Sequence, residues 1–431
     1  MESLLHFFSL SDPNIRYVVL GTILLTSSSA MVGCFTFLRK RSLIGDAVAH
    51  AVLPGVCLAF ILSGNKNPVI LIIGAFVTGW LSLVSVEFIK KNTRLKEDSS
   101  IGLVLSVFFG IGILLLTSIQ HSGNASQSGL DSFLFGKAAS LVSNDVIVFG
   151  IVGLILVISI ILFFKEFSLL AFDENFAKTI GFPVKALETV LTTLTVLAVV
   201  VGIQAVGVVL MAAMLITPAA AARYWTNRLA TMIFIAACMS MFSGIAGAFI
   251  SYQAPKMPTG PWMVLVISFI AVISFFFAPQ KGVMYRWKGR RNNKIRILEE
   301  NILKAMYQLG EIDKDFYRNR MVAELLNKRE FEQSLLLKGI RQLTKQGFVK
   351  NTKGQYALTE AGKNKGQRIT RLHRLWEMYL TEYVNLAPDH VHEDAETIEH
   401  IITPELEKKL EEQLKYPTLD PHASEIPYKK F

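Results

Sequence analysis

The chain has 431 residues, of which 52% are hydrophobic and 18% are charged, and its formal net charge is +10. This composition is too apolar for an ordinary soluble domain and indicates an integral membrane protein. The three cysteines lie in apolar runs without a CxxC pair, which predicts buried thiols rather than disulfides or metal ligands.

Apolar runs long enough to approach or cross a bilayer recur up to about residue 280. They lie at about 16–37, 45–63, 68–90, 101–119, 145–165, 187–203, 205–223, 230–252 and 261–278. Because the sixth and seventh runs are nearly continuous, the sequence predicts eight or nine transmembrane helices. Basic clusters follow the first, third, fifth, seventh and last runs, which places these ends and the C-terminal part in the cytoplasm.

Asp46 and His50 lie four residues apart at the start of the second run. This spacing places both side chains on one face of a helix. Ionisable groups at membrane depth usually line an ion pathway, and a carboxylate with an imidazole is a partial ligand shell for Mn²⁺, Fe²⁺ or Zn²⁺. Alternatively, Asp46 lies at the membrane edge and His50 bonds a neighbouring helix. Spacing alone does not separate these interpretations.

The loop after the fifth run has the pattern of a short capped helix. Asp173 can cap it, Glu174 lies in its first turn, and Gly181 with Pro183 ends it. A membrane subunit needs such a helix to dock on a motor protein, although an ordinary interfacial helix has the same pattern. No G-x-x-x-x-G-K-[ST] motif occurs, so this chain is not expected to cradle ATP phosphates itself.

Charged residues become frequent after about residue 280. The run 281–296 is rich in Lys and Arg, which is typical of a flank that touches anionic headgroups, with nucleic-acid binding as the alternative. Helices are then predicted from about 297, over about 317–326 and over about 329–345. Two short strands around a glycine turn follow, and a long helix starts at Thr359 or Glu360. This order predicts a winged helix.

The C-terminal part holds the most metal-like cluster of the chain. His373 and Glu377 are four residues apart on the long helix, and a second group on the next helix comprises His392, Glu396, Glu399 and His400. Two such stripes can enclose an octahedral oxygen and nitrogen site of the kind that Mn²⁺ or Fe²⁺ accepts. A solvated acidic helix is the alternative.

Three motifs resemble the permease subunits of ATP-binding-cassette importers for manganese, zinc and iron. They are the stretch 45–55 (GDAVAHAVLPG), the stretch 214–223 (MLITPAAAAR), and Phe172, Asp173 and Glu174 with Ala177 and Gly181. The resemblance covers about residues 10–280. It implies that Asp46 and His50 contact the ion and that the loop around 172–183 couples to an ATPase. It also implies three partners, which are a separate ATPase subunit, an extracellular metal-binding lipoprotein and a second, identical or different, permease subunit.

The tail resembles the iron- and manganese-dependent repressors. The matching stretches are 359–363 (TEAGK), 372–377 (LHRLWE), 391–400 (VHEDAETIEH) and 416–422 (YPTLDPH). The resemblance implies ligand roles for the six His and Glu residues named above and a dimerising helical layer. Asn301 and Lys304 stand where the family has an acidic or thioether ligand. The expected recognition helix offers mainly Gln333, Lys338 and Arg341 for reading bases.

We therefore expect an all-α polytopic membrane protein of eight or nine transmembrane helices, followed by a winged helix and a helical metal-binding and dimerisation domain. The expected segments are a transmembrane domain (1–280), a basic juxtamembrane linker (281–296), a winged-helix-like domain (297–362) and a metal-binding-like domain (363–431).

The predicted function is that of a permease that moves a divalent metal into a bacterial cell, with a cytoplasmic metal-sensing tail. Mn²⁺ is the first choice because of the tail, with Zn²⁺ and Fe²⁺ as alternatives. The chain is not expected to be an enzyme or to hold a tightly bound cofactor, since ATP hydrolysis belongs to the partner. Membrane lipids are expected partners and DNA is not. The alternative is a membrane-tethered, metal-responsive transcription regulator.

Overall fold

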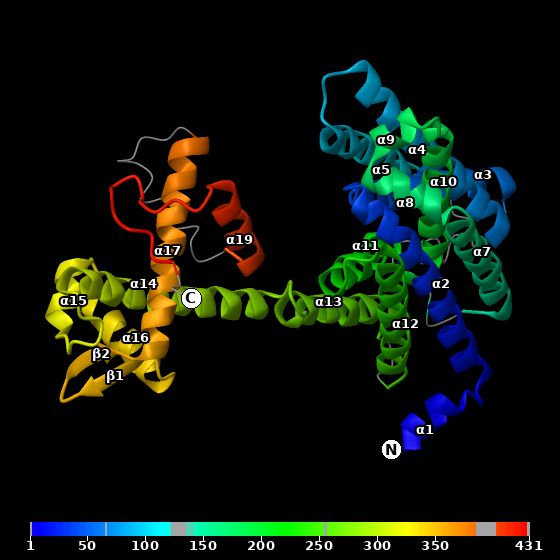
Figure 1. The fold of residues 1–431 in the computed structure, drawn as a ribbon. Coiled ribbons are helices and arrows are strands. Elements are labelled where there is room, and N and C mark those ends of the chain that lie inside the picture. Colours follow the sequence, from blue (N-terminus) through cyan, green and yellow to red (C-terminus); the bar gives the residue numbers. More distant parts are fainter. Residues whose placement is uncertain are drawn as a thin grey trace. The chain divides into compact units, whose positions relative to one another are not determined.

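The computed structural model describes residues 2–64, 67–121, 136, 138, 141–253, 257–384 and 402–428. The chain forms two compact units, Met1–Arg286 and Trp287–Phe431. Figure 1 follows their helices and strands along the chain, and each unit has its own hydrophobic clusters.

In the described part of the first unit, nine helices are long and apolar enough to cross a membrane. They are α2 (Pro13–Leu38), α3 (Ile44–Ser63), α4 (Pro68–Asn92), α5 (Glu97–His121), α7 (Ser143–Leu162), α10 (Val184–Val206), α11 (Val208–Trp225), α12 (Leu229–Gln253) and α13 (Thr259–Phe277). The larger predicted count is thus confirmed for these residues. Gly207 separates α10 from α11 with φ at 94°, a conformation that glycine adopts without strain. Three shorter helices are α1 (Glu2–Ser9), α8 (Phe164–Phe172) and α9 (Glu174–Thr179).

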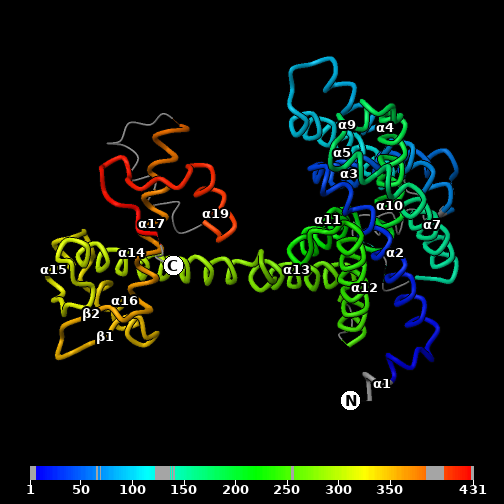
Figure 2. Tube along the Cα trace, viewed as in Figure 1, coloured from blue at the N-terminus to red at the C-terminus, as the bar shows by residue number. Residues whose placement is uncertain are grey.

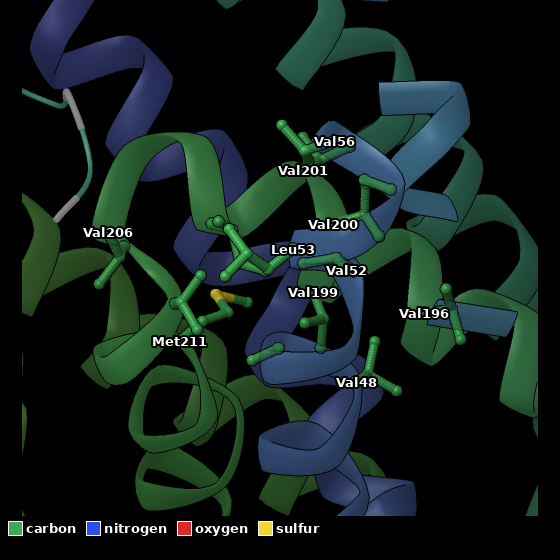
Figure 3. Packing of buried hydrophobic residues seen from close by; sticks show 14 of the residues in the cluster. Val48, Val52, Leu53, Val56, Val196, Val199, Val200, Val201, Val206 and Met211 are labelled. Carbon is green, nitrogen blue, oxygen red and sulfur yellow. The ribbon is translucent and has the colours of Figure 1, made fainter. Parts of the chain in front are cut away.

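Helices α3 and α10 are the most enclosed of these spans, since 72% of the residues in the apolar window of each are buried. Valines from both helices meet in the core of the unit, and Met211 of α11 packs beside them (Figure 3). A helix that is apolar on all sides belongs in the interior of a bundle. The sequence of α3 between its polar first turns and Ser63 fits that position.

Glycines allow the neighbours of α3 to approach its backbone closely. A methyl group on Gly74 of α4 would lie 2.5 Å from the Gly55 carbonyl oxygen and 2.6 Å from the Ala59 side chain. One on Gly112 of α5 would lie 2.9 Å from Leu53 and Pro54. Small residues are the usual means of close helix packing in membranes, where the hydrophobic effect does not drive helices together.

The second unit follows the predicted winged-helix order (Figure 2). Its elements are α14 (Val283–Asp313, which begins in the first unit), α15 (Val322–Lys328), α16 (Gln333–Lys345), β1 (Val349–Thr352), β2 (Gln355–Leu358), α17 (Glu360–Tyr383) and α19 (Pro404–Gln413). The two strands are antiparallel, with Val349 opposite Leu358. Thr359 caps α17 by accepting a hydrogen bond from the Gly362 amide at 3.1 Å.

Two element boundaries differ from the prediction. Helix α15 begins at Val322 rather than at about 317, because the backbone of Arg320 pairs with Tyr356 of β2 through two hydrogen bonds of 2.9 Å. The Arg320 guanidinium is also buried and donates to Asp313 at 2.8 Å. Helix α14 begins at Val283, so most of the expected linker is helical.

Replacement of Gly74 by alanine is expected to destabilise the membrane unit. Overpacking of a close contact costs about 1–3 kcal/mol, which exceeds the roughly 1 kcal/mol that alanine gains over glycine in a helix. Thermal unfolding of the detergent-solubilised protein should therefore occur at a lower temperature. Gly102→Ala in α5 is the matched control, since a methyl group there meets nothing within 4 Å. Equal melting temperatures for Gly74→Ala and the native protein would contradict the close-packing account.

Candidate functional site

Asp46 and His50 lie together on the first two turns of α3. Nε2 of His50 is 3.5 Å from Oδ1 of Asp46, so the predicted juxtaposition of this pair is present. The Asp46 side chain is 42% exposed and that of His50 is 19% exposed. The carboxylate in the first turn is also favoured by the positive end of the helix dipole.

The imidazole of His50 also contacts a neighbouring helix. Its ring packs edge-on against Phe109 of α5, with the ring centroids 4.9 Å apart. Nδ1 of His50 is buried and has no hydrogen-bond partner among the described residues. Buried polar atoms in proteins are normally satisfied, so an unpaired one is a place where a water molecule or an ion can bind. An imidazole nitrogen beside a carboxylate is suited to a divalent cation.

Pro54 follows His50 by one helical turn inside α3. Proline has no amide hydrogen, so the His50 carbonyl oxygen cannot receive the usual helical hydrogen bond from residue 54. The His50 carbonyl oxygen therefore lacks the donor that residue 54 supplies in an ordinary helix.

The second predicted site, the loop around 172–183, forms the short helix α9. Asp173 caps it as expected, because its carboxylate accepts a hydrogen bond from the Phe176 amide at 2.9 Å. Gly181 has φ at 86°, which ends the helix. Of the other predicted coupling residues, Phe172 is exposed at the end of α8 and Ala177 is buried.

Two arginines in the connection after α2 link the short helix α9 to the membrane helices. Arg39 is buried, pairs closely with Glu188 of α10 and lies 3.7 Å from Glu174 of α9. Arg41 lies 3.3 Å from Glu97, 3.6 Å from Glu188 and 3.7 Å from Glu87. We call these six residues the arginine network.

The arginine network borders the start of α3. A cavity of about 340 Å³ is lined by Arg41 with its three acidic partners, and also by Ile44, the first residue of α3. A hydrogen bond from Lys178 at 2.5 Å outweighs the partial burial of Glu174, and with the nearby arginines it lowers the pKa of Glu174. Glu174 therefore stays ionised at neutral pH, and its ion pairs weaken only as the pH falls into the acid range.

Sequence reasoning used these arginines only to orient the membrane spans. It did not identify Glu87 or Glu188 as their partners, although an acidic residue facing a basic cluster at the end of an apolar run is a usable signal.

In the C-terminal unit, His373 and Glu377 lie on one face of α17 as predicted. Nε2 of His373 is 3.0 Å from Oε1 of Glu377, and both side chains are buried. The other four predicted ligands, His392, Glu396, Glu399 and His400, lie outside the described residues. Within the described residues, no group of three or more His, Cys, Asp or Glu is arranged to hold a metal ion.

Helix α17 contacts α14 before this pair, at Gly366, and within it, at Arg374. Gly366 packs against Leu303 and Tyr307, and Arg374 forms two hydrogen bonds with Glu311 at 2.7 and 2.9 Å. On α14, Lys304 is buried and Oδ1 of Asn301 is buried without a hydrogen-bond partner in the described part. The two positions where the family has an acidic or thioether ligand therefore hold a buried lysine and an asparagine with a buried side-chain oxygen.

A partly buried polar pair within a bundle of apolar helices, together with a short capped helix, is typical of a polytopic membrane transport protein. Residues 11–278 match the ABC 3 transport family, and the chain belongs to this family. Residues 359–428 match the iron dependent repressor, metal binding and dimerisation domain.

Three similar proteins extend this result. The manganese transport system membrane protein MntC of Bacillus subtilis (strain 168) is 43% identical over 385 residues, which cover 88% of this chain and 87% of that protein. The zinc transport system membrane protein TroC of Treponema pallidum (strain Nichols) is 42% identical over 301 residues, or 70% of this chain and 99% of that protein. The solved structure of PsaBC from Streptococcus pneumoniae in complex with Fab is 35% identical, with a TM-score of 0.58, and covers 64% of this chain and 97% of that chain. The likeness to MntC is longer than the membrane unit and therefore extends into the C-terminal unit.

Proposed function

We propose that this chain is the permease subunit of an ATP-driven importer for divalent metal ions, with Mn²⁺ as the first substrate and Zn²⁺ or Fe²⁺ as alternatives. The observation that carries the proposal is the pair of Asp46 and His50 on α3, one of the two most enclosed membrane helices. In this pair, Nδ1 of His50 is buried and has no hydrogen-bond partner among the described residues. The relatives named for manganese and zinc transport support this substrate class.

Two side chains do not saturate an ion that prefers about six ligands. The partly exposed face of Asp46 leaves room for water or for groups of a second permease subunit. Incomplete coordination by the protein suits a transport pathway, because an ion whose whole coordination shell consists of protein ligands dissociates slowly.

The helix α9 is proposed to dock on a separate ATPase subunit, and the arginine network is proposed to carry its movement to α3. Glu174 on α9 pairs with Arg39, and Arg39 and Arg41 share Glu188. Both arginines belong to the short connection that leads directly into α3. A displacement of α9 therefore acts on the helix that bears Asp46 and His50 through paired charges rather than through a flexible loop.

The remaining proposals concern orientation and partners. We propose that the ends of α2, α4 and α11 and the C-terminal unit face the cytoplasm, and the positive residues that gather in the connections after these helices support this orientation. An extracellular metal-binding lipoprotein would deliver the ion at the other side. ATP hydrolysis belongs to the ATPase subunit and not to this chain.

The C-terminal unit is proposed to sense cytoplasmic metal and to restrain uptake when the ion is plentiful. His373 and Glu377 supply two ligands, and His392, Glu396, Glu399 and His400 are the proposed remainder. The match of residues 359–428 to a metal-binding domain supports this role. A tethered transcription regulator is not favoured, because the transport-family match spans residues 11–278 of the membrane unit, Met1–Arg286.

Asp46→Asn and His50→Gln are each expected to lower Mn²⁺ uptake by roughly tenfold or more, since even groups that only support a ligand change metal affinity by that amount. Radiolabelled Mn²⁺ uptake into proteoliposomes with the assembled transporter measures the effect. Asp98→Asn is the matched control, because Asp98 is an exposed carboxylate in the first turn of α5. Native uptake in the Asp46 and His50 variants would rule out this ion site.

Arg39→Gln is expected to reduce the Mn²⁺ transported per ATP hydrolysed by about fivefold or more, because a coupling energy of 1–3 kcal/mol corresponds to that change. Simultaneous measurement of hydrolysis and uptake gives the ratio. Lys91→Gln serves as the control, since Lys91 is 70% exposed and lies 3.9 Å from Glu87. Equal ratios in the two variants would show that the arginine network only stabilises the fold.

Removal of residues 297–431 is expected to leave initial uptake intact and to abolish its decline when intracellular Mn²⁺ is high. Glu377→Gln in the full chain should act in the same direction, because it removes a buried ligand without removing the domain. Uptake is followed in cells preloaded with different amounts of Mn²⁺. A native decline in both variants would exclude the sensing role.

A further inference from the structure

A basic groove lies wholly within the second unit, between the first turns of α14 and one face of α16. It encloses about 470 Å³. Its charged lining consists of Arg290, Arg291 and Lys294 from α14 and Lys338 from α16, and no acidic side chain lines it in the described structure. All four cationic side chains are on exposed residues.

The floor of this groove is apolar. Ile295 and Leu298 are half-buried, whereas Trp287 is 62% exposed and Leu335 is 47% exposed. The guanidinium of Arg291 lies 5.6 Å from the centre of the Trp287 ring. This cation–π contact stabilises the position of Arg291 over the aromatic face. The groove therefore combines an apolar floor with a positively charged rim.

Close packing shapes the groove. A methyl group on Gly339 would lie 2.6 Å from Ile302 and 3.3 Å from Leu298, so α16 rests directly on α14 at that point. Leu335, one helical turn before Gly339, and Lys338 also line the groove. Any larger residue at 339 would push the two walls apart.

We propose that the groove binds an anionic phospholipid, with the phosphate on the basic rim and the first part of an acyl chain on the apolar floor. The chain itself limits the distance to the membrane. Trp287 follows Phe277, the last residue of α13, by ten residues, and such a segment spans at most about 35 Å. Basic juxtamembrane segments are attracted to anionic lipids.

Two other occupants fit the groove less well. A second copy of this chain would bring the same four positive charges against each other. The four basic side chains could bind DNA phosphates, but the exposed apolar surfaces of Trp287 and Leu335 would form no hydrogen bonds with phosphates or base edges. The apolar floor is what distinguishes a lipid from both.

The experiment uses the full-length protein in nanodiscs that contain photoactivatable phosphatidylglycerol in a phosphatidylcholine background. After illumination, mass spectrometry is expected to locate adducts in residues 287–298 and 335–342. Lys338→Gln should lower the yield by about fivefold, as expected for one basic residue near an anionic surface. Lys345→Gln on the same helix is the matched control, since Lys345 is exposed and does not line the groove.

A second pair of variants separates this groove from a general attraction of the basic flank. Lys294→Gln should reduce labelling, whereas Lys288→Gln, in the same basic run but outside the groove, should not. Excess inorganic phosphate should not displace the lipid, because phosphate alone leaves the apolar floor uncovered. Equal losses in both members of either pair would overturn the proposal, as would equal labelling by photoactivatable phosphatidylcholine. Displacement of the lipid by double-stranded DNA, dependent on Lys338, would instead assign the groove to nucleic acid.

Discussion

The close packing of α3 against α4 and α5 is the constraint on which the rest of the membrane unit depends. Within a bilayer, helices gain little from hiding apolar surface, so their positions follow from how closely their backbones fit. Glycines on α4 and α5 bring those helices against the second half of α3, and Phe109 of α5 also contacts the imidazole in its first half. The same packing that stabilises the bundle therefore fixes the position and orientation of the Asp46 and His50 side chains within the bundle.

Features encoded by neighbouring residues could be predicted from the sequence, and features that join distant residues could not. The capped helix α9 depends on Asp173 and the amide of Phe176, three residues apart, and it was predicted. Arg39 and Glu188 are 149 residues apart, and no local pattern marks them as partners. Arg320 also pairs with a strand well beyond it in sequence, and this pairing shortened a helix that its own segment favours.

The candidate sites follow the same division. Helical spacing alone brought Asp46 to His50 and His373 to Glu377, because four residues make about one turn. The sequence did not show that Nδ1 of His50 lacks a partner or that Lys304 is buried, since both depend on packing between helices. Of the six ligands predicted in the tail, His373 and Glu377 lie in the described part of the chain.

Pro54 has an electrostatic consequence for α3. In the first two turns of this helix, His50 is the residue whose carbonyl would need a hydrogen-bond donor at position 54, and proline supplies none. A carbonyl dipole attracts a cation without adding a full negative charge, unlike a second carboxylate, which would deepen the binding energy and slow release. At the proposed ion site, the backbone of His50 would thus offer the ion, or the water that accompanies it, a neutral oxygen in place of part of the hydration shell. Proline at this position lets a strongly apolar helix provide polarity without a further ionisable side chain.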